Sequence, residues 1–152
     1  MEMSVVDLVT YLENDFAEHY ARLKVLPPFR AVKDILQHME DECRGHAQQA
    51  TRISRTHALP SAMSLGGILE LQTRIKRLLS EAILQHPEPA ALCTRLADAE
   101  ATVALLYRSI ADRFRSPESP QVAVAAEFDR LAAEELLHRD AMLKAAADQQ
   151  SG

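Results

Sequence analysis

The chain has 152 residues, of which 47% are hydrophobic and only 5% aromatic, and it contains four glycines and no tryptophan. This length suits a single domain, and so few glycines argue against a turn-rich β architecture. The net charge of −5 provides no basic surface for nucleic acid or for an anionic membrane. Alanine, leucine, glutamate and arginine dominate, which is typical of a compact all-α domain.

The sequence pattern predicts neither a signal peptide nor a membrane-spanning segment. The first residues carry acids where a signal peptide would carry cations, and no apolar run approaches the ~18 residues of a membrane span. Cys43 and Cys93 are too few for a disulfide framework. We therefore expect a cytoplasmic protein with no membrane partner.

Prolines and glycines divide the sequence into five helical blocks within one domain, residues 1–152. These blocks are expected at about residues 4–26, 29–56, 65–85, 90–115 and 121–147. Ser4 is the expected N-cap of the first block, and Pro27 and Pro28 end it. The residues after position 147 are expected to fray.

The lengths of the connections indicate how these blocks pack. The first two long blocks are joined tightly, as are the last two, so each pair is expected to form an antiparallel helical hairpin. The connection between the hairpins is long enough to cross the bundle from end to end and carries a short extra helix. The sequence therefore predicts a four-helix bundle with one long crossover.

The extra helix has more apolar positions than one groove of a bundle needs. They are Leu65, Ile68, Leu69, Leu71, Ile75, Leu78, Leu79 and Ile83. This surplus favours a homodimer contact, and a simple cap over the bundle is the alternative.

Each long helix presents an apolar seam that is interrupted at one level when read at steps of three and four residues. The interrupting residues are Glu13, Cys43, His46, Glu100, Glu135 and His138. Carboxylates that converge in a seam repel one another and are costly to bury without a cationic partner. Glutamate oxygen and imidazole nitrogen suit iron, manganese or zinc, so the pattern predicts a metal site. A buried polar network without metal is the alternative.

A weak internal repeat relates the two halves of the chain. The equivalent pairs, 87 residues apart in the first helices of the hairpins and 92 apart in the second, are Glu13/Glu100, Tyr20/Tyr107, Cys43/Glu135 and His46/His138. A duplicated hairpin that folds on itself would place two half-sites around a pseudo-twofold axis. Each tyrosine lies two turns from its glutamate, where its hydroxyl could bond a metal ligand or a bound oxygen species.

These residues resemble the rubrerythrin-like branch of the ferritin-like superfamily over residues 4–147. The matching elements are Glu13…Tyr20, Glu100…Tyr107, Glu135-x-x-His138 and the string Cys43-Arg44-Gly45-His46-Ala47. The resemblance implies a ferritin-like four-helix bundle with a di-iron carboxylate centre. It also implies a peroxidase- or ferroxidase-type oxidoreductase that oxidises Fe(II) with peroxide or oxygen, in oxidative-stress defence or iron handling.

The same resemblance assigns roles to individual residues. Five of them would hold one or two iron ions, with zinc or manganese as alternatives: Glu13, His46, Glu100, Glu135 and His138. Tyr20 and Tyr107 would orient ligands or quench radicals. The chain has no Cys-x-x-Cys pair and hence no rubredoxin module. Electrons would therefore come from a separate electron-donor protein or from iron itself.

Cys43 departs from the family pattern, because it stands where the relatives carry the glutamate of the second helix. Three outcomes are open: Cys43 ligates a modified site, Glu42 substitutes from the edge of the seam, or one metal position is lost. We favour a weakened or single-metal site. The alternative function is a non-enzymatic helical bundle with a degenerate site that acts as a binding or assembly partner. A thiol-based sensor at Cys43 ranks last.

The remaining histidines and several acids are expected on solvated faces or in loops. They are His19, His38, His57, His86, Glu18, Glu40, Glu127 and Glu134. Cys93 falls outside the seam of its helix, and we interpret it as structural or incidental.

Overall fold

The computed structural model describes residues 2–57, 59, 63–64, 66–85, 88–115 and 121–151. Within them the regular secondary structure is helical apart from one antiparallel pair of two-residue strands, which confirms the all-α prediction. The elements are β1 (Glu2–Met3), α1 (Val5–Leu23), the 3-10 helix η1 (Pro27–Val32), α2 (Lys33–Thr56), β2 (Met63–Ser64), α3 (Gly66–Gln85), α4 (Pro89–Phe114) and α5 (Val122–Ser151).

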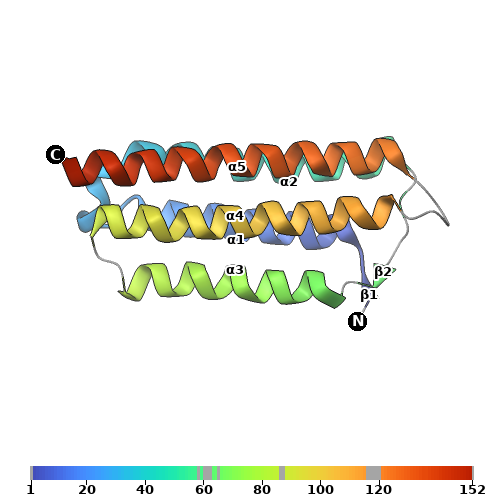
Figure 1. The fold of residues 1–152 in the computed structure, drawn as a ribbon, viewed down its shortest axis with the longest axis horizontal. Coiled ribbons are helices and arrows are strands. Elements are labelled where there is room, and N and C mark those ends of the chain that lie inside the picture. The colour runs from blue at the N-terminus through green and yellow to red at the C-terminus, as the bar shows by residue number, and fades with distance from the viewer. Residues whose placement is uncertain are drawn as a thin grey trace.

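The five α-helices lie side by side in three layers, as Figure 1 shows. α2 and α5 form one outer layer, α1 and α4 form the middle layer, and α3 lies on the other side. Helices α1 and α2 form one antiparallel hairpin, and α4 and α5 form the other (Figure 1). In the sequence α3 lies between the two hairpins. In space it runs from one end of the bundle to the other on the outer side and packs against α4 and α1. The extra helix is not short, because its 20 residues match the 19 of α1.

The first helix begins as predicted, since the Ser4 hydroxyl accepts a hydrogen bond from the Asp7 backbone N–H at 3.5 Å. The predicted start of the second helix at Phe29 is wrong. α2 begins at Lys33, and the segment from Pro27 to Val32 forms a 3-10 helix. Leu26 is extended, with ψ 131°, because a residue before proline avoids the α region. The chain therefore turns tightly before α2 can start.

The predicted end of the last helix is also wrong. α5 continues to Ser151, because the segment after Ala147 contains neither proline nor glycine before Gly152. At the same end of the hairpin, Pro89 occupies the first turn of α4, where its missing N–H leaves no helical bond unmade. These ends differ from the prediction by a few residues and do not change the topology.

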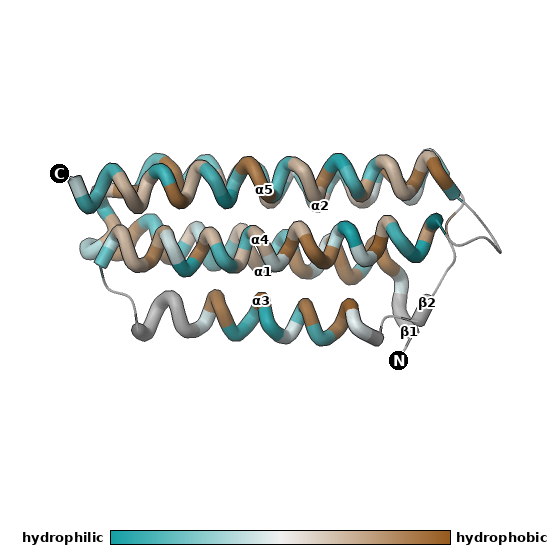
Figure 2. Tube along the Cα trace, in the orientation of Figure 1, coloured by the Kyte–Doolittle hydropathy of each residue, from teal (hydrophilic) through white to brown (hydrophobic). Residues whose placement is uncertain are grey.

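Apolar residues recur along the inner sides of the helices and alternate with polar ones (Figure 2). Aromatic rings pack inside each hairpin: the ring centroids of Phe16 and Tyr20, both on α1, are 5.8 Å apart, and those of Tyr107 on α4 and Phe128 on α5 are 6.2 Å apart. On α3 the buried apolar side chains are Ile68, Ile75, Leu78 and Leu79.

The packing of α3 on its own bundle accounts for these four buried positions. The homodimer contact stays a prediction. Leu65 and the side chain of Ile83 lie outside the part of the chain that the structure describes. None of the described helices is long and apolar enough to cross a membrane.

Candidate metal centre

Five predicted ligands meet at one level inside the bundle, although they come from four helices. Glu13 lies on α1, His46 on α2, Glu100 on α4, and Glu135 and His138 on α5. Their exposed fractions range from 1% to 8%. We call these five residues the interior site. Burial of three carboxylates at one level requires protons, histidine cations or metal ions to balance their charge.

The interior site divides into two overlapping groups of potential ligands. One group is Glu13, His46 and Glu135, and the other is Glu100, Glu135 and His138, with ligand atoms within 4.8 Å of one another in each. Glu135 Oε1 lies 2.7 Å from His46 Nδ1, whereas its Oε2 lies 3.4 Å from His138 Nδ1. The two oxygens of Glu135 therefore face different groups, as a carboxylate that bridges two ions does.

Two atoms of the interior site have no hydrogen-bond partner among the described residues. They are His46 Nδ1 and Glu135 Oε1, which are both buried. Their 2.7 Å separation is short, but it does not have hydrogen-bond geometry. Two ligand atoms of one transition-metal ion, each about 2.1 Å from it, also lie roughly 3 Å apart. The donor set and this unsatisfied pair fit a metal ion.

Both tyrosines of the repeat reach the interior site, and each does so across the bundle. Tyr20 on α1 donates a hydrogen bond to Glu100 Oε1 on α4 at 2.6 Å, and Tyr107 on α4 donates one to Glu13 Oε1 on α1. Each hydroxyl thus reaches a glutamate that the sequence predicts as a ligand, and this glutamate belongs to the other half of the repeat. That these tyrosines orient metal ligands stays a prediction. These crossed bonds leave the second oxygen of each glutamate free of the tyrosines.

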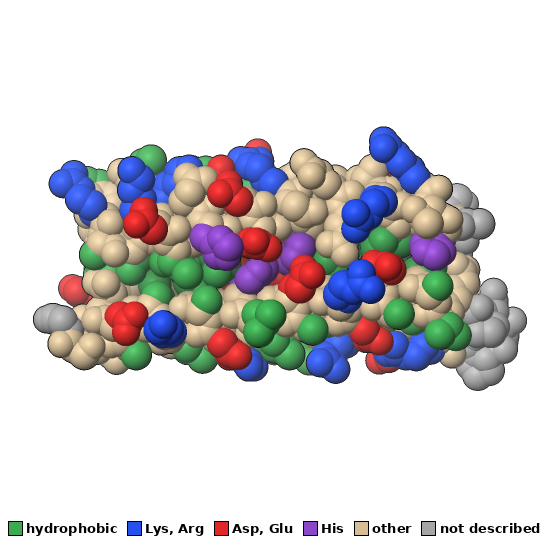
Figure 3. All heavy atoms as spheres, turned by 90° about the horizontal axis from the view of Figure 1, so that it is seen from above, with side chains coloured by type: hydrophobic (Ala, Val, Ile, Leu, Met, Phe, Trp, Pro, Cys, Tyr) green, Lys and Arg blue, Asp and Glu red, His purple; other side chains and the backbone are tan. Residues whose placement is uncertain are grey.

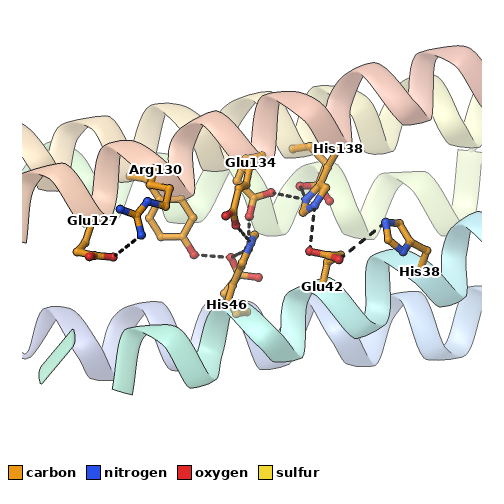
Figure 4. Close-up of polar contacts among 11 residues, drawn as sticks. His38, Glu42, His46, Glu127, Arg130, Glu134 and His138 are labelled. Atoms are coloured by element: carbon orange, nitrogen blue, oxygen red, sulfur yellow. Dashed lines mark hydrogen bonds and ion pairs between the residues drawn. The ribbon is translucent and has the colours of Figure 1, made fainter. Parts of the chain in front are cut away.

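The outward nitrogens of the two histidines also contact carboxylates. His46 Nε2 lies 2.7 Å from Glu134 Oε2, and His138 Nε2 lies 3.6 Å from Glu42 Oε2 (Figure 4). Glu134 is expected on a solvated face and its side chain is 37% exposed, but its carboxylate also contacts a buried ring, which the sequence analysis did not predict. Glu42 and Glu134 are 92 residues apart, which is the offset of the histidines themselves, so the repeat could have revealed Glu134.

A carboxylate beside the outward nitrogen of a histidine usually fixes the orientation of a metal-binding ring. A carboxylate that accepts from one ring nitrogen holds the ring so that the other nitrogen faces the metal. In this chain the nitrogen that faces inward is Nδ1 in both His46 and His138. The rings stack with centroids 5.4 Å apart, so the two half-sites are in direct contact.

Without metal, protons balance the charges of the interior site. Burial lowers the pKa of His46, but Glu13 and Glu135 outweigh it and raise the pKa to about 12. Burial also lowers the pKa of His138, but Glu100 and Glu135 raise it to about 10. Burial and the neighbouring charges of Glu100 and Glu13 raise the pKa of Glu135 well above its usual value. A metal ion would therefore displace protons when it binds.

Cys43 lies beside the interior site but belongs to none of the potential ligand groups among the described residues. Its side chain is buried, and burial together with the carboxylates of Glu13 and Glu100 raises the pKa of the thiol well above its usual value. A protonated thiol is a weak nucleophile and a weak ligand. This disfavours the thiol sensor. Of the predicted substitutes, Glu42 is the one that joins a potential ligand group, with His46 and His138.

Two further expectations are corrected away from the interior site. Glu40 does not lie on a solvated face: it is buried and accepts from Lys24 Nζ at 2.6 Å and from Arg44 Nη2 at 3.1 Å. Its hydrogen bond from Lys24 lowers its pKa despite burial. His19 is half-buried rather than exposed, and burial lowers its pKa.

Several other expectations agree with the structure. Cys93 is buried in the core, in line with a structural role, and His38 is exposed. His86 lies outside the described residues.

Histidine and acidic side chains are visible at the surface near the middle of the face formed by α2 and α5 (Figure 3). Glu42 and Glu134 have side-chain exposures of 39% and 37%, so they lie at the boundary between the interior site and solvent.

Comparison with protein-family models, curated proteins and solved structures finds no match for this chain.

Proposed function

We propose that this chain is a metal-binding protein of the rubrerythrin-like, ferritin-like kind, which binds iron in the interior site. The close approach of His46 Nδ1 and Glu135 Oε1 carries this proposal, because these two buried atoms lie 2.7 Å apart without hydrogen-bond geometry, and a metal ion that displaces their protons would bind both. Glu13, His46 and Glu135 would hold one ion, and Glu100, His138 and Glu135 the other. Oxygen and nitrogen ligands of this kind suit iron, with zinc or manganese as alternatives.

The proposed reaction is oxidation of Fe(II) to Fe(III) by peroxide or oxygen. The electrons that reduce the peroxide or oxygen would come from the iron itself, or from a separate electron-donor protein that reduces Fe(III) back to Fe(II). Bound iron supplies the redox chemistry. Glu13 and Glu100 neutralise charge, Glu135 links the two positions, and the crossed bonds from Tyr20 and Tyr107 hold Glu13 and Glu100 in place. The apolar core around the site excludes water.

Cys43 makes this site weaker than one with a second shared carboxylate. The position equivalent to Glu135 in the first hairpin supplies a protonated thiol in place of an anion. We therefore expect the two ions to bind with different affinities, the second more weakly.

Metal analysis of the purified chain after anaerobic loading with Fe(II) tests the proposal. We expect up to two equivalents per chain, and less than one equivalent would overturn it. Glu135→Gln is the informative variant, because glutamine resembles the protonated glutamic acid that the metal-free site holds. It should lose most of the bound iron, whereas Glu127→Gln, on the same helix and paired with Arg130, should retain it.

The non-enzymatic alternative is distinguished by activity. Peroxide-dependent oxidation of Fe(II) should be slower with Glu135→Gln than with the unchanged chain. Equal rates would favour a helical bundle that serves as a binding or assembly partner, since protons already balance the charges of the metal-free site.

A further inference from the structure

A third potential ligand group lies outside the interior site, at its border with solvent. It consists of Glu42, His46 and His138, whose ligand atoms lie within 4.8 Å of one another. We call it the mouth cluster. It uses Glu42, which the interior site does not, and it reaches His138 at Nε2, on the side opposite to the nitrogen that faces Glu135.

The fold leaves the mouth cluster on the accessible side of the bundle. α3 covers α1 and α4 on the opposite side (Figure 1). The α2–α5 face carries histidine and acidic side chains near its middle, and the Glu42 side chain there is 39% exposed (Figure 3). Figure 4 shows Glu42 between His138 and His38, whose Nε2 lies 3.9 Å from Glu42 Oε1. A cation that approaches this face meets Glu42 before any carboxylate of the interior site.

We propose that the mouth cluster is an outer binding site for a divalent transition-metal ion, which it receives from solvent and passes to the interior site. Imidazole nitrogen and carboxylate oxygen suit the same ions as the interior ligands do. A half-exposed anion also raises the local concentration of cations at the face. This role in loading rests on the proposed function, because it needs an interior site to load.

Glu134 provides a matched control for Glu42. It occupies the equivalent position of the second hairpin, has nearly the same exposure, and contacts the other histidine, but it does not belong to the mouth cluster. Glu134→Gln therefore removes one negative charge from the same face and one carboxylate contact from a histidine ring, as Glu42→Gln does, but it keeps all three members of the mouth cluster. Any effect confined to Glu42→Gln reports the outer site rather than general attraction of cations.

The test is uptake of Co(II), followed by its visible absorption in stopped-flow mixing and by equilibrium titration. We expect Glu42→Gln to take up Co(II) about tenfold more slowly than Glu134→Gln, which removes the equivalent carboxylate contact from the other histidine. Circular dichroism of each variant checks that the helices are intact.

Each other result has a definite meaning. Unchanged uptake by Glu42→Gln, or equal slowing by both variants, would overturn the outer site. If the unchanged chain binds no tight Co(II), the proposed function fails. A weak equivalent that depends on Glu42 would then still support the outer site, without its role in loading.

Discussion

The hydroxyl of Tyr20 lies 2.6 Å from Glu100 Oε1, although the two residues are 80 positions apart and on different hairpins. The pair Tyr107 and Glu13 makes the reverse connection. Each tyrosine thus bonds the glutamate that lies seven residues before the equivalent tyrosine in the other half of the repeat. All four side chains are buried, so these bonds tie α1 to α4 inside the apolar core.

Replacement of these tyrosines should destabilise the metal-free chain. Tyr20→Phe and Tyr107→Phe each remove a buried hydrogen bond to a carboxylate, and we expect each to lower the free energy of unfolding by about 1.5–3 kcal/mol. Urea unfolding in the presence of a chelator measures the change. Tyr11→Phe is the control, because Tyr11 is 53% exposed and should change the free energy by less than about 0.5 kcal/mol. Equal effects of all three would contradict the role of the crossed bonds.

The sequence predicted the interior site better than its surroundings. The seam positions of Glu13, Glu100 and His138 follow from helical periodicity, which fixes the face of a residue without knowledge of its partners. The crossing of the tyrosine bonds could not be predicted, because it depends on the distance between α1 and α4. Glu134 was missed because it precedes a seam residue, and its position on the helix alone does not show that it reaches a histidine of the other hairpin.

The helix ends illustrate a second limit of the sequence. Ser4 was identified by local chemistry, because a cap depends on residues three positions away. The start of α2 at Lys33 was not, since Pro27 and Pro28 allow either a helix or a 3-10 turn after them. Burial of Phe29 and Val32 against the bundle accompanies the tight turn, and that packing is a tertiary property.

Metal affinity should increase with pH. In the metal-free site the pKa values of His46 and His138 are raised to about 12 and about 10, so both rings hold protons that must leave before they bind an ion. The apparent dissociation constant for Co(II) should therefore fall between pH 6 and about 9. Binding in weakly buffered solution should release protons, which a pH indicator detects. A dissociation constant independent of pH would contradict this arrangement of protons.

The stability of the metal-free chain should decrease as the pH rises, whereas its metal affinity increases. The pKa of each histidine is higher in the folded chain than its usual value of 6.5, so their stabilising contribution is complete below about pH 6.5. It should be lost progressively as the pH rises toward about 10 for His138 and about 12 for His46. Urea midpoints with a chelator, measured from pH 6 to 9, should fall. A rise across this range would contradict the prediction.

Substitution of Cys43 distinguishes a ligand from a spectator. Because its protonated thiol lies outside the potential ligand groups, Cys43→Ser should leave the number of bound Co(II) ions unchanged. Cys43→Glu adds a carboxylate at the position equivalent to Glu135 and should tighten the weaker ion by about tenfold or more, which is about 1.4 kcal/mol. Loss of one ion in Cys43→Ser would show that the thiolate is a ligand.

Both thiols should be unreactive in the folded chain. Burial raises the pKa of Cys93 to about 11, and burial with the adjacent carboxylates raises that of Cys43 well above its usual value. With a pKa of about 11 instead of 9.0, Cys93 is present as thiolate about 100 times less often than an ordinary thiol near neutral pH. A disulfide reagent such as DTNB should therefore modify neither cysteine at pH 7 within the time in which both react in urea. Rapid modification of Cys43 in the folded chain, with Cys43→Ser as the control, would make the thiol sensor, which the sequence analysis ranks last, the leading interpretation of this residue.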